Sequence, residues 1–114
     1  MTPPRERLLA AIGSAWSSAT STRWRPDAPA TGQCSVTALL VHETLGGRLL
    51  KTRVEGAWHF YNEIDGQRLD LTAGQFAEPI RYEDQRADPA DALADTSPEQ
   101  LAALRAATEE ALAR

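Results

Sequence analysis

One nearly continuous apolar segment constrains the fold of this chain more than any other feature. Residues 34–45 have the spacing of a helix, with Cys34, Ala38 and Val41 on one face and further apolar side chains beside them. A helix that is apolar around most of its circumference has to be buried on most of its surface. Gly46-Gly47 ends this helix, because glycine readily adopts the left-handed conformation that follows a helix C-terminus. We therefore expect the helix to lie mostly within the core.

Three segments after this helix predict an antiparallel sheet. Residues 48–55 alternate loosely between apolar and polar types, and residues 58–64 form a strand rich in aromatic side chains. Asp65-Gly66 is a typical two-residue hairpin turn, after which residues 67–71 return as the third strand. An edge strand at residues 79–82 would make a fourth. The predicted class is α+β, with helices packed on a small antiparallel sheet of three or four strands.

The chain length of 114 residues fits a single domain, residues 1–114. Its expected core spans residues 5–82 and opens with an amphipathic helix at residues 5–16. Residues 83–96 are strongly polar and contain a proline, so we interpret them as a polar connector. A capped helix at residues 97–113 closes the chain.

The composition argues against several classes of partner. Sixteen acidic and twelve basic residues give a formal charge of −4 without any basic block, so we expect no nucleic acid partner. One cysteine allows no internal disulfide and two histidines are too few for a convincing metal site, so we expect neither metal nor cofactor. Every apolar run falls short of the roughly 18 residues of a membrane span, so we expect no membrane partner. The lone cysteine suits a reducing compartment, and we expect a cytoplasmic protein.

The single cysteine lies where a loop turns into the apolar helix. A helix N-terminus and a nearby imidazolium both favour the thiolate and lower the pKa of a cysteine from about 8.5. His59 on the aromatic strand is the candidate imidazole, and Asp70 on the next strand is the candidate carboxylate that orients it. Taken alone, Cys34 fits an inert core position better, so the interpretation depends on how the hairpin places the other two residues.

The hairpin register decides whether these two residues can meet. With a two-residue turn, Ile64 faces Gln67 and Tyr61 faces Asp70. His59 lies on the same side of its strand as Tyr61, so His59 and Asp70 are diagonal neighbours about 7–8 Å apart at the backbone. A shift of one residue would move Asp70 to the opposite face. The spacing therefore predicts a Cys-His-Asp arrangement with His59 and Asp70 in contact.

Four further residues are secondary candidates. Asn62 is a rival orienting residue, although on an ideal strand it points away from His59. Gln33 precedes the nucleophile, and its amide is a candidate donor to an oxyanion, together with the backbone N–H of the cysteine. Tyr61 and Trp24 are candidates for lining a groove.

Several blocks of the sequence occur together in a fixed order. They are Gly-Gln-Cys-x-Val-Thr-Ala at 32–38, Gly46-Gly47, His59-Phe60-Tyr61-Asn62, Asp65-Gly66, Asp70-Leu71-Thr72 and Gln75-Phe76. This arrangement resembles the bacterial YunG-like family over about residues 16–82. That family consists of small uncharacterised proteins, so the resemblance implies no particular activity.

More distantly, the order of the cysteine helix, the histidine strand and the aspartate strand resembles the core of transglutaminase-like and papain-like proteins. That resemblance implies a minimal core of this type and a catalytic triad of Cys34, His59 and Asp70. It also implies an oxyanion role for Gln33. The chain departs from the papain-like pattern in length, because it has no room for the second lobe that usually builds the substrate cleft.

Two hypotheses of function follow. The leading one is a cysteine-nucleophile enzyme that acts on an amide or thioester carbonyl as a hydrolase, deamidase or acyltransferase. Cys34 attacks, His59 serves as base and then as acid, and Asp70 orients His59; the substrate is a peptide segment or a small amide or acyl compound. The alternative is a non-catalytic binding module that retains a degenerate papain-like fold. The oligomeric state is left open.

Overall fold

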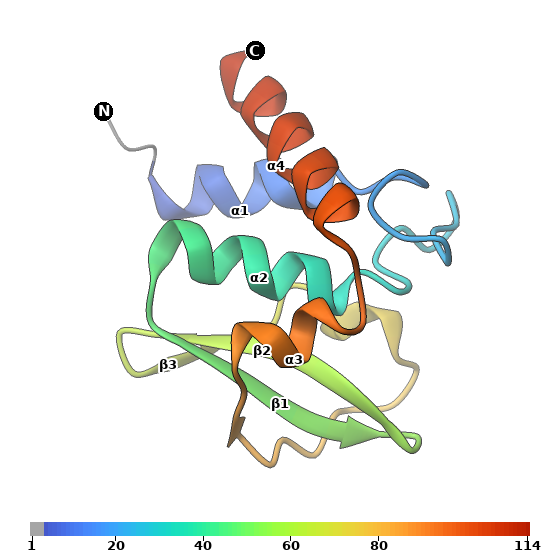
Figure 1. Cartoon of the computed structure of the whole chain (residues 1–114), viewed down its shortest axis with the longest axis vertical. Helices are drawn as coiled ribbons and strands as arrows, with labels where there is room; N and C mark the ends of the chain where they lie inside the picture. The colour runs from blue at the N-terminus through green and yellow to red at the C-terminus, as the bar shows by residue number, and fades with distance from the viewer. Residues whose placement is uncertain (1–3) are drawn as a thin grey trace.

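The computed structural model describes residues 4–114 and confirms the α+β class. Three layers are visible in Figure 1. The helices α1 (Arg5–Ser14) and α4 (Pro98–Ala113) cover one side of α2 (Cys34–Leu45), and the sheet lies on its other side. The apolar helix is thus the middle layer, as its sequence predicts.

The sheet has four antiparallel strands in the order β3-β2-β1-β4. Their bounds are β1 (Arg48–Val54), β2 (Ala57–Ile64), β3 (Gln67–Leu69) and β4 (Gln85–Arg86). β2 and β1 are the long central strands, and each outer strand is short.

The β2–β3 hairpin has the register that its turn predicts. Asp65 and Gly66 both have positive φ, 53° and 77°, as the two central residues of a type I′ turn require. Ile64 pairs with Gln67, and the ladder continues to Leu69. The third strand ends there, two residues earlier than expected, so Asp70 follows directly after it.

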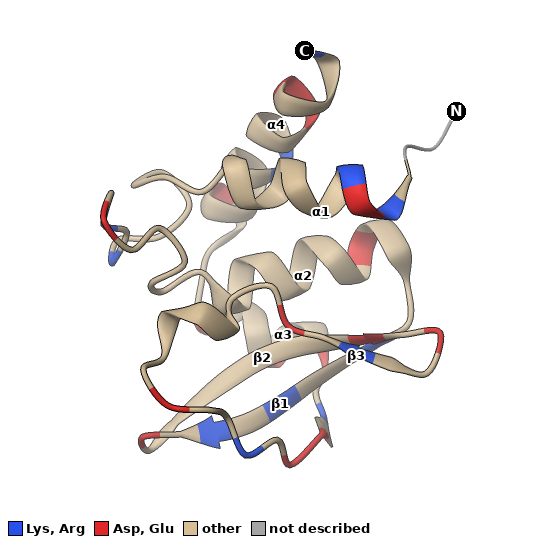
Figure 2. Cartoon of the chain, turned by 180° about the vertical axis from the view of Figure 1, so that it is seen from behind, with Lys and Arg blue, Asp and Glu red and all other residues tan. Residues whose placement is uncertain are grey.

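α2 is buried from two sides. Val36 and Leu40 belong to a cluster shared with α1 and α4, which contribute Ile12 and Leu104, both fully buried. Ala38 belongs to a second cluster that joins the helix to the sheet. In Figure 2 the ribbon of α2 is uncharged except near its C-terminal end, which fits a helix covered on both faces.

The fourth strand is not where the sequence predicts it. Residues 79–82 form no strand, and β4 lies at Gln85–Arg86, paired with Leu50 and Lys51 of β1. Pro79 has no N–H to give to a ladder. The chain after it is instead fixed by side chains, because the Thr52 hydroxyl donates to the Arg81 carbonyl at 3.1 Å.

The polar stretch at residues 83–96 is more than a connector. Besides β4 it contains a short helix, α3 (Pro89–Leu93), which starts with a reciprocal capping box between Asp88 and Asp91. Ala92 of this helix is fully buried in the cluster between α2 and the sheet. The segment predicted as a polar connector therefore also contains secondary structure and one core residue.

The two flanking helices follow their predicted start signals. α1 begins as predicted but ends at Ser14, two residues earlier than its apolar pattern indicates. α4 is capped by Ser97, whose side chain accepts a hydrogen bond from the backbone N–H of Gln100 at 3.1 Å. Within residues 4–114, no helix combines the length and the apolar character that a membrane span requires.

Candidate active site

The nucleophile candidate is the first residue of α2. Cys34 is 6% exposed, and Gln33 occupies the position just before the helix. The backbone N–H groups in the first turn of any helix have no acceptor within that helix, so they are available to a ligand. The thiol lies 3.8 Å from the hydroxyl of Ser35. The chain therefore presents a nearly buried thiol beside a set of backbone donors.

His59 and Asp70 are in direct contact. The Nε2 atom of His59 lies 2.7 Å from Oδ2 of Asp70, and the two side chains are 1% and 5% exposed. His59 is on β2 and Asp70 follows β3, so the hairpin register creates this contact. The diagonal relation derived from a two-residue turn is the one that the structure contains.

The carboxylate of Asp70 is held by donors on both of its oxygens. Oδ2 accepts a hydrogen bond from the Tyr82 hydroxyl at 2.8 Å, in addition to its contact with His59. Oδ1 accepts from the backbone N–H of Thr72 at 3.2 Å. Burial and the hydrogen bond to Asp70 raise the pKa of Tyr82 to about 12, so its phenol remains a donor. The carboxylate therefore presents His59 with a fixed acceptor.

The imidazole ring is also held by aromatic neighbours. Tyr61 stacks on it with ring centroids 5.9 Å apart, and Phe76 meets it edge-on at 5.0 Å. Such contacts restrict rotation of the ring. With Nε2 turned toward Asp70, Nδ1 is the nitrogen that remains for the thiol, and it has no hydrogen-bond partner of standard geometry.

The thiol and the imidazole shift each other's ionisation. Burial raises the pKa of Cys34, but the nearby imidazole of His59 with its charge and the backbone of Phe60 outweigh burial, and the pKa is lowered. Burial lowers the pKa of His59, but the hydrogen bond to Asp70, the nearby thiol of Cys34 and the charges of both groups raise it to about 9. Both shifts favour a thiolate beside an imidazolium. In such a pair the contact often tightens only when substrate binds.

A pocket opens onto this pair. It has a volume of about 260 Å³ and is lined by Cys34 and His59 together with Gln75, Phe76 and Trp58 among others. A second pocket of about 310 Å³ shares residues 23, 57 and 58 with the first, so the two adjoin. The small domain therefore has a place for a substrate next to its thiol.

Two of the sequence candidates make other contacts. The side-chain oxygen of Gln33 accepts from the Thr20 hydroxyl at 2.8 Å, and its nitrogen donates to the Ser17 carbonyl at 3.5 Å. Asn62 donates to the Ala38 carbonyl of α2 at 3.0 Å. Asn62 thus points to the helix, on the face of β2 opposite His59, as strand alternation predicts.

The two candidate groove residues lie outside both pockets. Tyr61 is 1% exposed, and its hydroxyl donates to the side chain of Asp84 at 2.8 Å. Trp24 is half-buried in the loop before α2, and its indole N–H is buried without an acceptor among the described residues. Arg23 and Trp58 occupy the lining positions instead.

Sequence reasoning missed several residues around the pair. Tyr82 and Phe76 hold Asp70 and His59, and Gln75 lines the pocket. Ser35 donates to the carboxylate of Asp95, which ties the chain before α4 to the start of α2. Gln75 and Phe76 lie in one of the blocks of the family resemblance, which was the one available signal for them.

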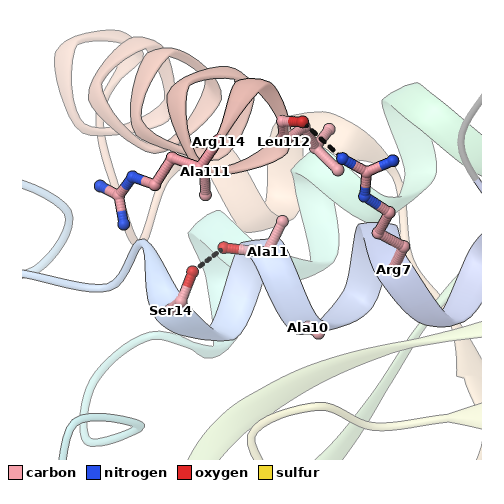
Figure 3. A pocket seen from close by; sticks show the side chains of 7 residues that line it. All are labelled: Arg7, Ala10, Ala11, Ser14, Ala111, Leu112 and Arg114. Carbon is pink, nitrogen blue, oxygen red and sulfur yellow. Dashed lines mark hydrogen bonds between the residues drawn. The ribbon is translucent and has the colours of Figure 1, made fainter.

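A pocket elsewhere in the described part of the chain lacks this chemistry. Figure 3 shows a pocket of about 310 Å³ between α1 and α4, where Arg7 donates to the Leu112 carbonyl at 2.8 Å and alanines form much of the lining. Its lining residues include no cysteine, histidine, aspartate or glutamate. Across residues 4–114 no three histidine, cysteine, aspartate or glutamate side chains are grouped to hold a metal ion.

The fold and the site define a small α+β protein in which a helix-start cysteine and a strand histidine line one pocket, and an aspartate contacts that histidine. Residues 4–113 match the family described as YunG protein, and the chain belongs to this family. A Bacillus subtilis strain 168 protein named "Uncharacterized protein YunG" is 40% identical over 102 residues, which cover 90% of this chain and 89% of that relative. No solved structure matches the chain.

Proposed function

We propose that this protein is a cysteine-nucleophile enzyme that acts on an amide or thioester carbonyl. The observation that carries the proposal is the placement of His59, which contacts Asp70 through one nitrogen and lines the pocket that Cys34 lines. Its Nε2 atom is fixed by Asp70 at 2.7 Å, and its imidazole lowers the pKa of Cys34 in the same pocket. A structural histidine needs one satisfied nitrogen, whereas an activating histidine needs one nitrogen for its orienting partner and one for the nucleophile.

The first half of the proposed reaction forms an acyl-enzyme. The thiolate of Cys34 attacks the carbonyl carbon, a C–S bond forms, and an electron pair moves to the carbonyl oxygen. That pair returns as the bond to the leaving group breaks. The imidazolium of His59 gives its proton to the departing amine or thiolate, since its pKa of about 9 keeps it protonated near neutral pH. Asp70 orients the ring throughout.

The second half regenerates the thiolate. Neutral His59 now takes a proton from the second reactant, whose nucleophilic atom attacks the thioester carbon. The C–S bond breaks, Cys34 leaves as thiolate, and His59 is again an imidazolium. Water as the second reactant gives hydrolysis or deamidation, and an amine gives acyl transfer. The pocket has a volume of about 260 Å³ and is lined in part by Trp58 and Phe76. This size favours a small acyl group or one side chain of a peptide segment.

The oxyanion needs donors where charge develops. The backbone N–H of Cys34 in the first turn of α2 is one such donor in this proposal. Gln33 is the donor that the papain-like resemblance suggests. Its Oε1 and one amide hydrogen are used by Thr20 and Ser17, so only its second amide hydrogen is left for this task.

Acylation by an activated ester tests the proposal. The chain is incubated with p-nitrophenyl acetate, release of nitrophenolate is followed, and the adduct is located by mass spectrometry. Because Cys34 is the one cysteine of the sequence, a thioester adduct can form only there. We expect a burst of nitrophenolate and an acetyl adduct that are both lost in Cys34→Ala and strongly reduced in His59→Gln.

Absence of acylation at Cys34 would overturn the proposal. If the wild-type protein forms no adduct on Cys34 with this ester or with a panel of acyl thioesters and amides, the triad does not act as a nucleophile site. The alternative of a non-catalytic binding module with the same fold is then favoured. Labelling at the rate of an ordinary free thiol, unaffected by His59→Gln, would count against the proposal in the same way.

A further inference from the structure

Gln75 has an unpaired donor among the described residues and lines the same pocket as the thiol. It is the last residue of the short 3-10 helix η1 (Ala73–Gln75) and lines the pocket that contains Cys34 and His59. Its Nε2 atom is shielded from solvent and donates to no group of the described residues. A buried amide N–H without an acceptor costs free energy, so it calls for an explanation. A ligand oxygen in the adjoining pocket would supply the missing acceptor.

The orientation of this amide follows from chemistry. Its other terminal atom lies 3.1 Å from the backbone N–H of Gly32, which can only donate. The atom that meets Gly32 is therefore the amide oxygen, and the NH₂ group has to face the other way. Gly32 is two residues before the nucleophile, so the same hydrogen bond fixes the amide close to the start of α2.

Two groups at the pocket favour a negative oxygen as the acceptor, and the charges of Arg23 and Glu55 in its lining are of opposite sign. The imidazole of His59, raised to a pKa of about 9, and the first turn of α2 both favour negative charge. Gln75 on η1 and Cys34 on α2 line the same pocket, and the hydrogen bond from Gly32 to Gln75 links the loop before α2 to η1. Gln33, by contrast, has its oxygen and one amide hydrogen bound to Thr20 and Ser17.

We propose that the side-chain amide of Gln75, together with the backbone N–H of Cys34, binds the oxyanion that forms when Cys34 attacks a carbonyl. Gln75 is then a catalytic residue, and Gln33 a residue that holds the preceding loop. This inference rests on the proposed acyl chemistry of Cys34. It goes beyond it by naming the donor and by reassigning a role that the sequence suggests for Gln33.

The test compares two reactions of the same thiol. Acylation by p-nitrophenyl acetate develops an oxyanion, whereas alkylation by iodoacetamide is a direct displacement at carbon and develops none. Gln75→Glu keeps an oxygen for the Gly32 N–H and removes the donor, and Gln75→Met removes both without adding charge. Gln67→Glu, on the exposed start of β3, is the matched control for the added charge.

The expected result is selective. Loss of one oxyanion donor typically costs about 10²–10³-fold in rate, so both Gln75 variants should acylate about 10²–10³-fold more slowly. Alkylation of Gln75→Met should stay within about threefold of wild type at each pH, and Gln67→Glu should match wild type in both reactions. The thermal unfolding midpoint of each variant reports whether it is folded.

Each other outcome has a defined meaning. Equal acylation of wild type and both folded Gln75 variants overturns the role of Gln75 while leaving the nucleophile intact. A parallel fall of acylation and alkylation in Gln75→Met also overturns it, because the residue would then act only by holding the thiol. Failure of the wild type to acylate overturns the proposed function and this inference together. Slowed acylation in Gln33→Ala with unchanged Gln75 variants would return the role to Gln33.

Discussion

Replacing Asp70 by asparagine isolates the electrostatic part of the His59 contact. The substitution keeps the shape of the side chain and leaves one oxygen, but it removes the negative charge. In the wild type, burial lowers the pKa of His59, and the hydrogen bond to Asp70, the nearby thiol of Cys34 and the charges of both raise it from an ordinary 6.5 to about 9. Asp70 is the stronger of the two partners that raise it. Its loss should therefore move the titration of His59 to lower pH.

The size of the shift can be bounded. The difference between 6.5 and about 9 corresponds to about 3 kcal/mol, at about 1.4 kcal/mol per pKa unit. The favourable contributions of Asp70 and Cys34 also have to overcome burial, so together they exceed this figure. Asp70 supplies the larger share, and we expect Asp70→Asn to lower the pKa of His59 by more than about one unit.

The assay is an NMR titration of the imidazole ring protons between about pH 5 and pH 10, a range that spans ordinary and raised histidine pKa values. The sequence has two histidines, so a His42→Gln background leaves one ring to follow. Asp27→Asn, on an exposed loop where Asp27 pairs with Arg25 at 3.0 Å, is the matched control. A wild-type His59 that titrates near 6.5, or an unchanged pKa in Asp70→Asn, would refute the reasoning.

Three further predictions concern the thiol and the core. His59→Gln removes the strongest influence that lowers the pKa of Cys34 and leaves burial, which raises it, opposed only by the backbone of Phe60 and by Ser35. Iodoacetamide labelling should therefore shift to higher pH, with about tenfold less labelling near neutral pH for each pKa unit; an unshifted rate profile contradicts this. Gly47 has a φ of +70°, and in Gly47→Ala the added Cβ would clash with the carbonyl oxygen of Glu63. Urea unfolding should show that the free energy of unfolding falls by more than about 2 kcal/mol. Gly56→Ala, at φ +82° in open space, should cost about 1–2 kcal/mol, and equal losses would argue against the steric reason. Leu104→Ala, at a position 0% exposed, should cost about 2–5 kcal/mol, and a loss below about 1 kcal/mol would mean that α4 is not part of the core.

Local signals were sufficient for the parts of the site that depend on spacing. The apolar period of residues 34–45 and the glycine pair after it define α2 with its bounds, and the two-residue turn defines the β2–β3 register. Those two facts bring His59 against Asp70 and put Cys34 at a helix start. Each depends on neighbours in sequence or directly across a hairpin, which is why the sequence alone predicts them.

The parts that sequence reasoning missed depend on the path of the chain in space. β4 has two residues with exposed side chains, too short for any alternation to be read. α3 carries a start signal in Asp88 and Pro89, but five residues give no helical period. The orientation of the side-chain amides of Gln33 and Gln75 is even harder to predict from sequence. It depends on hydrogen-bond partners in other loops, which are Thr20 for Gln33 and Gly32 for Gln75.

The length of the hairpin between His59 and Asp70 fixes the relative position of these two residues. The two residues are eleven positions apart, and the contact exists because that number, with a two-residue turn inside it, places both on one face. Residue types at the tip of the hairpin can change without loss of the contact. Insertion or deletion of a single residue would break the contact, because successive side chains of a strand point to opposite faces. The His59–Asp70 contact thus depends on the number of residues between the two side chains as much as on their types. Insertions and deletions in the hairpin tip should therefore disrupt the site more than substitutions there.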